Sequence, residues 1–369
     1  MATQLISPTN GHPLRPAGPQ LLTDGERLWP LVDGIAYLRE GPLARHAVTL
    51  LENDQIDAAR RALLTDRDRF APGEPADPAA LDPLFAPNTS LRTAMQILGY
   101  GPVGDYFAHR WTSPTYGTGT ELLERTVRTG EPVVEVACGI GHFLRLLEQH
   151  DFTTIGIDIV YSKLWLARRF LGVRGLLVCG DIERSALLRF VTLERVAPTV
   201  FCHDAFYFFE RKDAALRHLR QLAGKAGRVA IGHVHTRQDA HEAGFAATPA
   251  DYQQLTSAPV LSEGRADDPA AVYWIEGGEN EQLYSLRNAT PGLRWNPLLS
   301  REGVRWPSAG WRREYEADCA RTGTKSLAAI WEMADRTSLV SDAPRAVLTT
   351  TDYQHYHAQR LLVNLPAQW

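Results

Sequence analysis

Hydrophobic and polar positions follow two rhythms along this chain of 369 residues. Between residues 121 and 236, short apolar runs alternate with stretches whose apolar positions recur every three or four residues. The runs predict buried β-strands and the stretches predict amphipathic helices. The predicted strands are Val133–Val136, Thr154–Asp158, Gly175–Val178, Thr199–Cys202 and Arg228–Val234. Short apolar strands separated by helices form a sheet covered on both faces, so the predicted fold class is α/β with a doubly wound, mostly parallel sheet.

The segments on either side of this alternation have other patterns. Before it, Asp33-Gly34 between two apolar runs predicts a β-hairpin, and the spacing over Pro42–Leu64 predicts a helix. A proline-bearing stretch over 71–90 and a short helix over Leu91–Leu98 follow. After the alternation, the stretch Arg237–Pro307 is polar and loop-rich. Beyond it we expect a helix over 311–333 and strands at Ala346–Thr350 and Leu361–Leu365 that rejoin the sheet.

These patterns divide the chain into four parts. We expect a small β module at 1–41, a helical linker and lid at 42–120, a Rossmann-like ligand-binding domain at 121–236, and a substrate cap with closing strands at 237–369. In a doubly wound sheet the ligand binds at the carboxyl ends of the strands. The search for chemistry therefore concentrates on those ends.

Composition narrows the class of protein. Apolar residues make up 44% and charged residues 22%, values typical of a globular protein, and the net charge of −4 gives no reason to expect a nucleic-acid partner. No apolar run approaches the roughly 20 residues that span a bilayer. The four cysteines are scattered without paired metal-ligand spacing: Cys138, Cys179, Cys202 and Cys319. We expect a reduced, cytoplasmic protein without membrane contact.

The most informative stretch is Val133-Val134-Glu135-Val136-Ala137-Cys138-Gly139-Ile140-Gly141-His142. It predicts a buried strand that carries a carboxylate, a tight turn on small residues and the start of a helix. The glycines let the backbone approach a ligand closely. A dinucleotide fingerprint would need a third glycine where Leu144 stands, and the Glu135 carboxylate would repel a pyrophosphate. A carboxylate at this place suits the ammonium group of a bound amino acid instead.

Three more predicted strands carry polar residues at their carboxyl ends. Asp158 is the last residue of the strand Thr154–Asp158, Asp181 follows the strand ending near Val178, and Cys202-His203-Asp204 stands at the end of the next strand. In order and spacing these motifs resemble those of class I methyltransferases that use S-adenosylmethionine (SAM), over about 121–236. The resemblance implies that SAM is the cofactor and that the residues binding it are Glu135, Ala137, Cys138, Gly139, Gly141, Asp158, Ile159, Asp181, Ile182, Cys202 and His203.

The resemblance also implies a role for each part of this set. The turn from Ala137 to Gly141 would hold the methionine part of SAM, and Asp158 would hold the ribose. Asp181 with Ile182 would frame the adenine, and Cys202-His203 would contact the amino-acid end through backbone groups.

A second resemblance concerns the first forty residues. The run Trp29-Pro30-Leu31-Val32-Asp33-Gly34-Ile35 is similar to the end of the small zinc-ribbon-like activator subunits of tRNA and protein methyltransferases. Ser7 stands where their leading cysteine would be, so we expect no zinc in this module. The resemblance implies that the module adds an edge strand to the methyltransferase sheet, in cis or across a homodimer.

The candidates for catalysis lie at strand ends near the donor methyl group: His203, Asp204, Tyr207, His233 and His235. His233 and His235 fall on one face of a strand, because side chains alternate with period two. They would contact the acceptor or act as a base, make structural hydrogen bonds, or bind a metal together with Asp204 and His241. Since methyl transfer needs no metal in most members of the family, we assign no metal.

Two other groups are candidates with plainer explanations. Tyr106, Trp111 and Tyr116 would close over the sulfonium or pack in the core, and His355 with His357 would lie in an exposed stretch. The leading functional hypothesis is methyl transfer to a small molecule of natural-product or sugar type. The alternatives are a macromolecular (RNA or protein) methyltransferase and a SAM-binding protein that does not methylate.

Overall fold

A computed structural model describes residues 3–71, 74–110, 114–184, 190–193, 196–236, 243–265, 268–277, 298–300, 303–305 and 368. Within this part of the chain, eleven strands form one sheet in the order β12-β13-β11-β10-β6-β7-β8-β5-β4-β3-β2. Its parallel centre comprises β6 (Val133–Val136), β7 (Thr154–Asp158), β8 (Leu176–Cys179), β10 (Thr199–His203) and β11 (Arg228–His235). The predicted α/β class and doubly wound, mostly parallel sheet are confirmed.

Helices cover both faces of this centre. Before β6 lies α5 (Pro114–Thr126), and the connections between the strands contain α6 (His142–Gln149), α7 (Tyr161–Arg169) and α8 (Lys212–Ala223). Successive residues of β10 point to opposite layers: Phe201 packs on Phe143 of α6, whereas Val200 and Cys202 belong to the core that includes Leu219 of α8. The two apolar cores exclude water from the sheet, so that polar groups gather at its carboxyl end.

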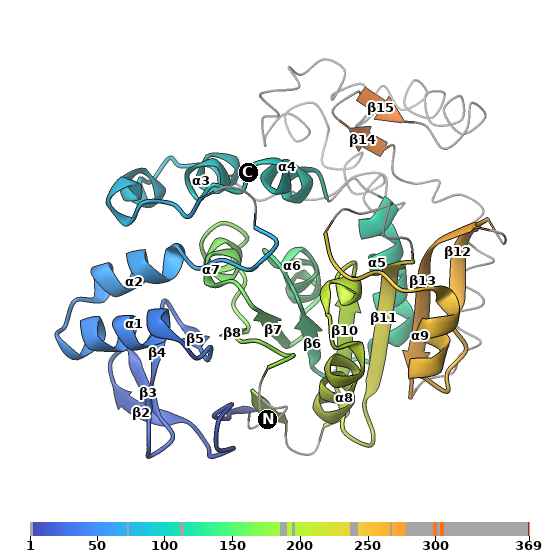
Figure 1. Cartoon of the computed structure of the whole chain (residues 1–369), viewed down its shortest axis with the longest axis horizontal. Helices are drawn as coiled ribbons and strands as arrows, with labels where there is room; N and C mark the ends of the chain where they lie inside the picture. Colours follow the sequence, from blue (N-terminus) through green and yellow to red (C-terminus); the bar gives the residue numbers. More distant parts are fainter. Residues whose placement is uncertain are drawn as a thin grey trace.

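The amino-terminal strands extend the sheet on one side, at the left of Figure 1. They are β2 (Arg15–Gly18), β3 (Leu21–Thr23), β4 (Leu28–Val32) and β5 (Ile35–Tyr37). The predicted hairpin is present, since Val32 pairs with Ile35 across Asp33 and Gly34, both with positive φ. β5 pairs in parallel with β8, so the module adds its strand in cis.

A hydrogen-bond network holds the loops of this module together. Ser7 Oγ and Trp29 Nε1 both donate to Asp24 Oδ2, at 2.6 and 3.1 Å. The backbone N–H groups of Glu26 and Arg27 donate to Asp24 Oδ1. Burial opposes ionisation of this carboxyl, but the hydrogen bonds outweigh burial and lower the pKa of Asp24 to about 2. Nearby, β1 (Thr3–Leu5) pairs with β9 (Val191–Leu193).

The predicted helix over Pro42–Leu64 is two helices. α1 (Pro42–Glu52) ends at Asn53, and α2 (Ile56–Leu64) begins after Asp54, whose φ is 58°. Asparagine and aspartate tolerate this left-handed conformation better than most residues, which permits the break. The following segment contains η1 (Pro78–Ala80), η2 (Asp82–Phe85), α3 (Leu91–Ile97) and α4 (Pro102–His109).

The other edge of the sheet corrects the prediction for Arg237–Pro307. This stretch is not loop throughout: it contains α9 (Pro249–Leu255), β12 (Leu261–Arg265) and β13 (Asp268–Glu276), and β13 runs antiparallel to β11 at the right of Figure 1. The run Val272-Tyr273-Trp274-Ile275 is buried on both faces, so it lacks the alternation that marks a half-exposed strand. Two short strands follow, β14 (Leu298–Ser300) and β15 (Gly303–Arg305). The predicted helix over 311–333 and the strands Ala346–Thr350 and Leu361–Leu365 lie outside the described residues.

Candidate functional site

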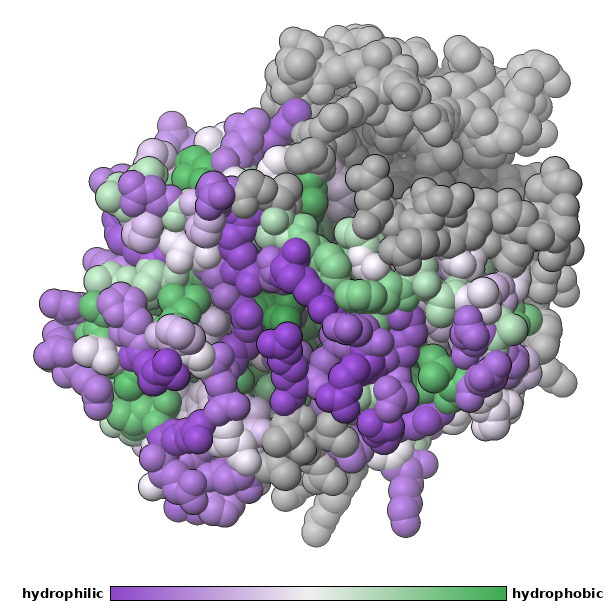
Figure 2. Space-filling model, viewed as in Figure 1, coloured by the Kyte–Doolittle hydropathy of each residue, from purple (hydrophilic) through white to green (hydrophobic). Residues whose placement is uncertain are grey.

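A cavity of about 770 Å³ opens at the carboxyl ends of β6, β7, β8, β10 and β11. This is the edge at which a doubly wound sheet binds its ligands, and the volume falls in the range of small-molecule sites, roughly 300–1,000 Å³. In the coloured part of the face shown in Figure 2, hydrophilic side chains predominate, with apolar surface in a recess near the middle. We call the end of the cavity near Asp158 the cofactor end and the end near Asp204 the acceptor end.

The cofactor end is built around the turn between β6 and α6. Ala137, Gly139 and Gly141 all have positive φ, at 57°, 56° and 81°. Gly139 N–H donates to Asp158 Oδ2 at 2.8 Å, and Val160 N–H donates to Asp158 Oδ1 at 3.0 Å. The Asp158 side chain therefore holds the turn and the end of β7 in a fixed relation, and it lines the cavity.

Glu135 also lines the cavity, in the middle of β6. The residue is 4% exposed, and its Oε2 atom accepts no hydrogen bond. Burial raises the pKa of Glu135 to about 8, although the nearby positive charge of Arg110 acts in the opposite direction. A buried carboxylate oxygen with no partner is costly, and a cationic ligand in the cavity would relieve that cost.

The structure brings most of the predicted cofactor residues to the cavity wall. In the wall are Glu135, Ala137, Cys138, Gly139, Asp158, Ile159, Asp181, Ile182 and His203. Gly141 and Cys202 are not wall residues: Gly141 starts α6 against Ala167 and Val173, and Cys202 points into the apolar core on the α8 side. Cys202 lies away from the cavity because its side chain alternates with that of His203 along β10.

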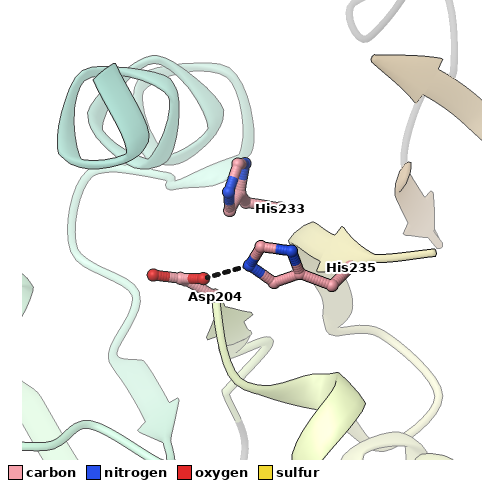
Figure 3. A group of neighbouring side chains, drawn as sticks. All are labelled: Asp204, His233 and His235. Carbon is pink, nitrogen blue, oxygen red and sulfur yellow. Dashed lines mark ion pairs between the residues drawn. The ribbon is translucent and has the colours of Figure 1, made fainter. Parts of the chain in front are cut away.

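The acceptor end gathers all five predicted catalytic side chains: His203, Asp204, Tyr207, His233 and His235 line the cavity. Asp204 follows β10 with φ 56°, and His233 in β11 has φ 47°. The pairing of β11 with β13 shifts register between Ile231 and Val234, so a bulge surrounds His233. Figure 3 shows how Asp204, His233 and His235 approach one another from the two neighbouring strands.

Asp204 is contacted by several side chains of the acceptor end. Its Oδ2 accepts hydrogen bonds from Arg110 Nη1 at 2.8 Å and from Tyr106 Oη at 2.5 Å, and its Oδ1 accepts one from Tyr207 Oη at 3.4 Å. His235 Nε2 lies 3.7 Å from Oδ1. Burial opposes ionisation, but His235 and the Arg110 charge outweigh it and hold the pKa of Asp204 well below its usual range.

His203 and Tyr207 are uncharged, unlike the Asp204 carboxylate. His203 Nε2 lies 2.7 Å from the Thr115 carbonyl oxygen, and its ring stacks on Phe201. Burial, together with the charge of Arg110, lowers the pKa of His203 to about 3, so the ring is neutral. Burial and the neighbouring Asp204 carboxylate raise the pKa of Tyr207. Neither group is poised to take a proton near pH 7, because a base of that kind needs a pKa near the working pH.

Several wall residues were missed because they come from distant segments. Arg110 precedes α5, and its side chain is 8% exposed, with its guanidinium over the rings of Tyr106 and Phe143. At the cofactor end, Lys163 lies 3.1 Å from Asp68 and 3.8 Å from Asp158. Asp68 had a signal in the sequence, because it belongs to a dense run of charges over 66–69 between a helix and a proline-bearing stretch.

A link from the amino-terminal module also reaches this wall. Arg39 Nη1 donates to the Ile159 carbonyl at 2.8 Å and pairs with Asp66 at 2.6 Å. Asp66 in turn accepts from Tyr161 N–H at 3.2 Å. The backbone that follows Asp158 is therefore held by residues outside the central domain.

Of the remaining candidates, Tyr106 is 42% exposed and lines the cavity, whereas Tyr116 is buried and stacks on Phe143. Trp111, His241, His355 and His357 lie outside the described residues. No helix in the part of the chain that the structure describes is long and apolar enough to cross a membrane.

Comparison with known proteins identifies the central domain. Residues 134–231 match the model of a family described as a methyltransferase domain. The matched range begins in β6 and ends in β11, and it contains the turn, Asp158, Asp181 and Asp204. This central domain is a class I SAM-dependent methyltransferase domain, with SAM as its cofactor.

Solved structures with a similar arrangement include three methyltransferases. One is the complex of the Haloferax volcanii Trm112 methyltransferase activator with a methyltransferase (18% identity, 46% of this chain and 93% of that chain, TM-score 0.36). Another is magnesium protoporphyrin IX methyltransferase from Synechocystis with bound SAM (16%, 47% and 82%, 0.33). The third is N-methyltransferase NodS from Bradyrhizobium japonicum with S-adenosyl-L-homocysteine (17%, 43% and 85%, 0.35). No curated protein matches the sequence.

Proposed function

We propose that this enzyme transfers the methyl group of SAM to a small-molecule acceptor of natural-product or sugar type. The observation that carries the proposal is that most of the predicted cofactor residues and all five predicted catalytic residues line one cavity of about 770 Å³. A space of this size suits SAM beside a compact acceptor better than it suits a folded macromolecule. The net charge of −4 also gives no electrostatic attraction for RNA.

At the cofactor end, we assign the ribose to Asp158 and the adenine to Asp181 with Ile182. The turn from Ala137 to Gly139 would hold the methionine part, since its positive φ angles expose backbone groups to the cavity. Glu135 would receive the ammonium group, because its buried Oε2 has no hydrogen-bond partner. SAM supplies a methyl group that is already activated for displacement.

At the acceptor end, the side chains would align the acceptor and handle its proton. In-line displacement gains most from alignment, and a hydroxyl or amine acceptor also has to lose a proton. Asp204, Tyr207, His233 and His235 contact one another and the cavity, so we assign them to the acceptor. His203, held neutral against Thr115, would shape the wall.

The experiment is a survey of acceptors with the purified full chain. Formation of S-adenosyl-L-homocysteine is followed with pools of phenols, sugars, amines and carboxylic acids, and in parallel with RNA and with protein extracts. We expect turnover with one small-molecule class, and loss of that turnover in Asp204→Asn but not in Asp213→Asn, an exposed acid on α8. Turnover confined to RNA or protein would refute the small-molecule assignment, and SAM binding without any turnover would favour a non-methylating protein.

A further inference from the structure

We infer that Asp204, His233 and His235 form a binding site for one divalent transition-metal ion of the zinc type. Each of the three residues offers one ligand atom, and the three atoms lie within 4.8 Å of one another. Two imidazoles and one carboxylate are a ligand set that zinc and similar ions prefer. This inference departs from the expectation, drawn from the sequence, that no metal is bound.

The spacing of the ligand atoms fits an ion better than a direct hydrogen bond. Asp204 Oδ1 and His235 Nε2 are 3.7 Å apart, which is too long for a hydrogen bond. Two ligands of a tetrahedral ion with bonds of about 2.0–2.1 Å lie about 3.4 Å from each other. An ion placed between the two side chains would need only a small adjustment of either one.

The backbone is distorted at both strand ends that supply the ligands. Asp204 and His233 adopt positive φ without being glycine, a conformation that strains the backbone at each position. The bulge around His233 changes the direction of that side chain, and bulges of this kind are common next to active sites. Asp204 N–H donates to the Gly232 carbonyl at 2.9 Å, which ties the two distortions together.

Outer contacts orient two of the three ligands. Tyr273 Oη lies 3.1 Å from His233 Nδ1, a contact that helps to orient the imidazole ring. Arg110 and Tyr106 contact Oδ2 of Asp204, the oxygen opposite the one that faces His235. Hydrogen bonds to the distal atoms of ligands are typical of metal sites.

The charge of Arg110 also limits the affinity of the site for a metal ion. A guanidinium bound to the same carboxylate repels a cation, so we expect micromolar affinity rather than the tighter binding of structural zinc. Three protein ligands leave coordination positions open, as in catalytic sites. The ion would therefore serve the reaction rather than hold the fold together.

All three ligand residues line the cavity in which the acceptor would lie. The following step rests on the proposed function. An acceptor hydroxyl that binds the ion loses its proton to solvent more readily, because the cation stabilises the oxygen anion. That oxygen then forms a bond to the methyl carbon while the carbon–sulfur bond breaks and its electron pair stays on sulfur. The site thus favours an acceptor that is methylated on oxygen.

The test measures metal binding directly on the full chain. Protein freed of metal by a chelator is titrated with Co²⁺, whose visible absorption reports tetrahedral nitrogen and oxygen ligands, and then with Zn²⁺ in competition. We expect one ion per chain, affinity lowered at least about tenfold in His233→Ala and in His235→Ala, and no change in His46→Ala, an exposed histidine on α1. Circular dichroism checks that each variant is folded, and His235→Asn serves as a smaller change.

The outcomes separate this inference from the proposed function. Absence of stoichiometric Co²⁺ binding, or equal binding in all the histidine variants, would overturn the metal site. Methyl transfer that continues in the chelated protein, together with absent binding, would leave the proposed function standing. Stoichiometric binding in a chain that methylates no small molecule would support the site and refute the proposed function.

Discussion

The two ends of the cavity are held by different kinds of contact. At the cofactor end, backbone N–H groups of Gly139 and Val160 bind Asp158, and Glu135 keeps an oxygen without a partner. At the acceptor end, the side chains of Arg110 and Tyr106 bind Asp204. The cofactor end is therefore a fixed frame with one charge left to be satisfied by the ligand. The acceptor end is a network of side chains in which the acid already has an arginine and a tyrosine as partners.

The largest expected effect comes from breaking that network at Arg110. In Arg110→Met the side-chain length is kept and the guanidinium is lost, so the Asp204 carboxylate stays buried without its ion-pair partner. We expect the free energy of unfolding in urea to fall by about 3 kcal/mol.

Arg217→Met is the matched control for this prediction. The ion pair of Arg217 with Asp213 is about half exposed, and such pairs contribute at most about 1 kcal/mol. Equal losses in the two variants would show that Asp204 does not depend on Arg110.

The second-largest effect is expected on SAM binding, when the fixed frame of the cofactor end is changed at Asp158. Asp158→Ala removes the carboxylate that we assign to the ribose and that accepts from Gly139 and Val160. A hydrogen-bonded charged group contributes about 1.5–3 kcal/mol, so the Kd for SAM in isothermal titration calorimetry should rise by roughly 10- to 150-fold. Asp213→Ala, a change at an exposed acid on α8, should leave the Kd for SAM unchanged. An unchanged Kd in Asp158→Ala would contradict the ribose assignment.

Glu135→Gln should stabilise the protein without SAM and weaken its affinity for SAM. The pKa of Glu135 in the folded state, about 8, is above its ordinary value of 4.5. Its contribution to stability is therefore complete below pH 4.5 and is lost as the pH rises through 8. The neutral glutamine avoids that loss, so at pH 8–9 the variant without SAM should unfold at higher urea concentration than the parent. We expect a gain on the order of 1–2 kcal/mol.

In SAM binding the parent should be superior to Glu135→Gln, because the ammonium group of SAM needs the Glu135 carboxylate. Between pH 6 and 8 the affinity of the parent for SAM should rise as Glu135 loses its proton, and the affinity of Glu135→Gln should be weaker and nearly constant. Glu52→Gln, an exposed change on α1, should follow the parent in both measurements. A parallel pH dependence in the parent and in Glu135→Gln would exclude Glu135 as the ammonium partner.

The difference between the ends also explains what the sequence could predict. The cofactor end is local: Glu135 to Gly141 is one strand, turn and helix, and Asp158 ends the next strand. Such units have recognisable patterns of apolar residues and glycines. The acceptor end is not local, since Arg110 lies 94 positions from Asp204, and the bulge at His233 depends on pairing with β13, a strand that its polar surroundings concealed. Patterns along the chain hold no information on contacts of that range.

The smallest expected effect compares one hydroxyl at each end. Tyr106 Oη donates to Asp204, while Tyr100 Oη lies 2.9 Å from Ser162 Oγ beside the cofactor end. One hydrogen bond contributes about 0.5–1.5 kcal/mol, which corresponds to a change of roughly two- to twelvefold. Tyr106→Phe should raise the KM for the acceptor within this range and leave the Kd for SAM unchanged. Tyr100→Phe should raise the Kd for SAM and leave the acceptor KM unchanged. If either variant altered both constants equally, the two ends would behave as one network, and the division between a fixed frame and an adjustable network of side chains would be wrong.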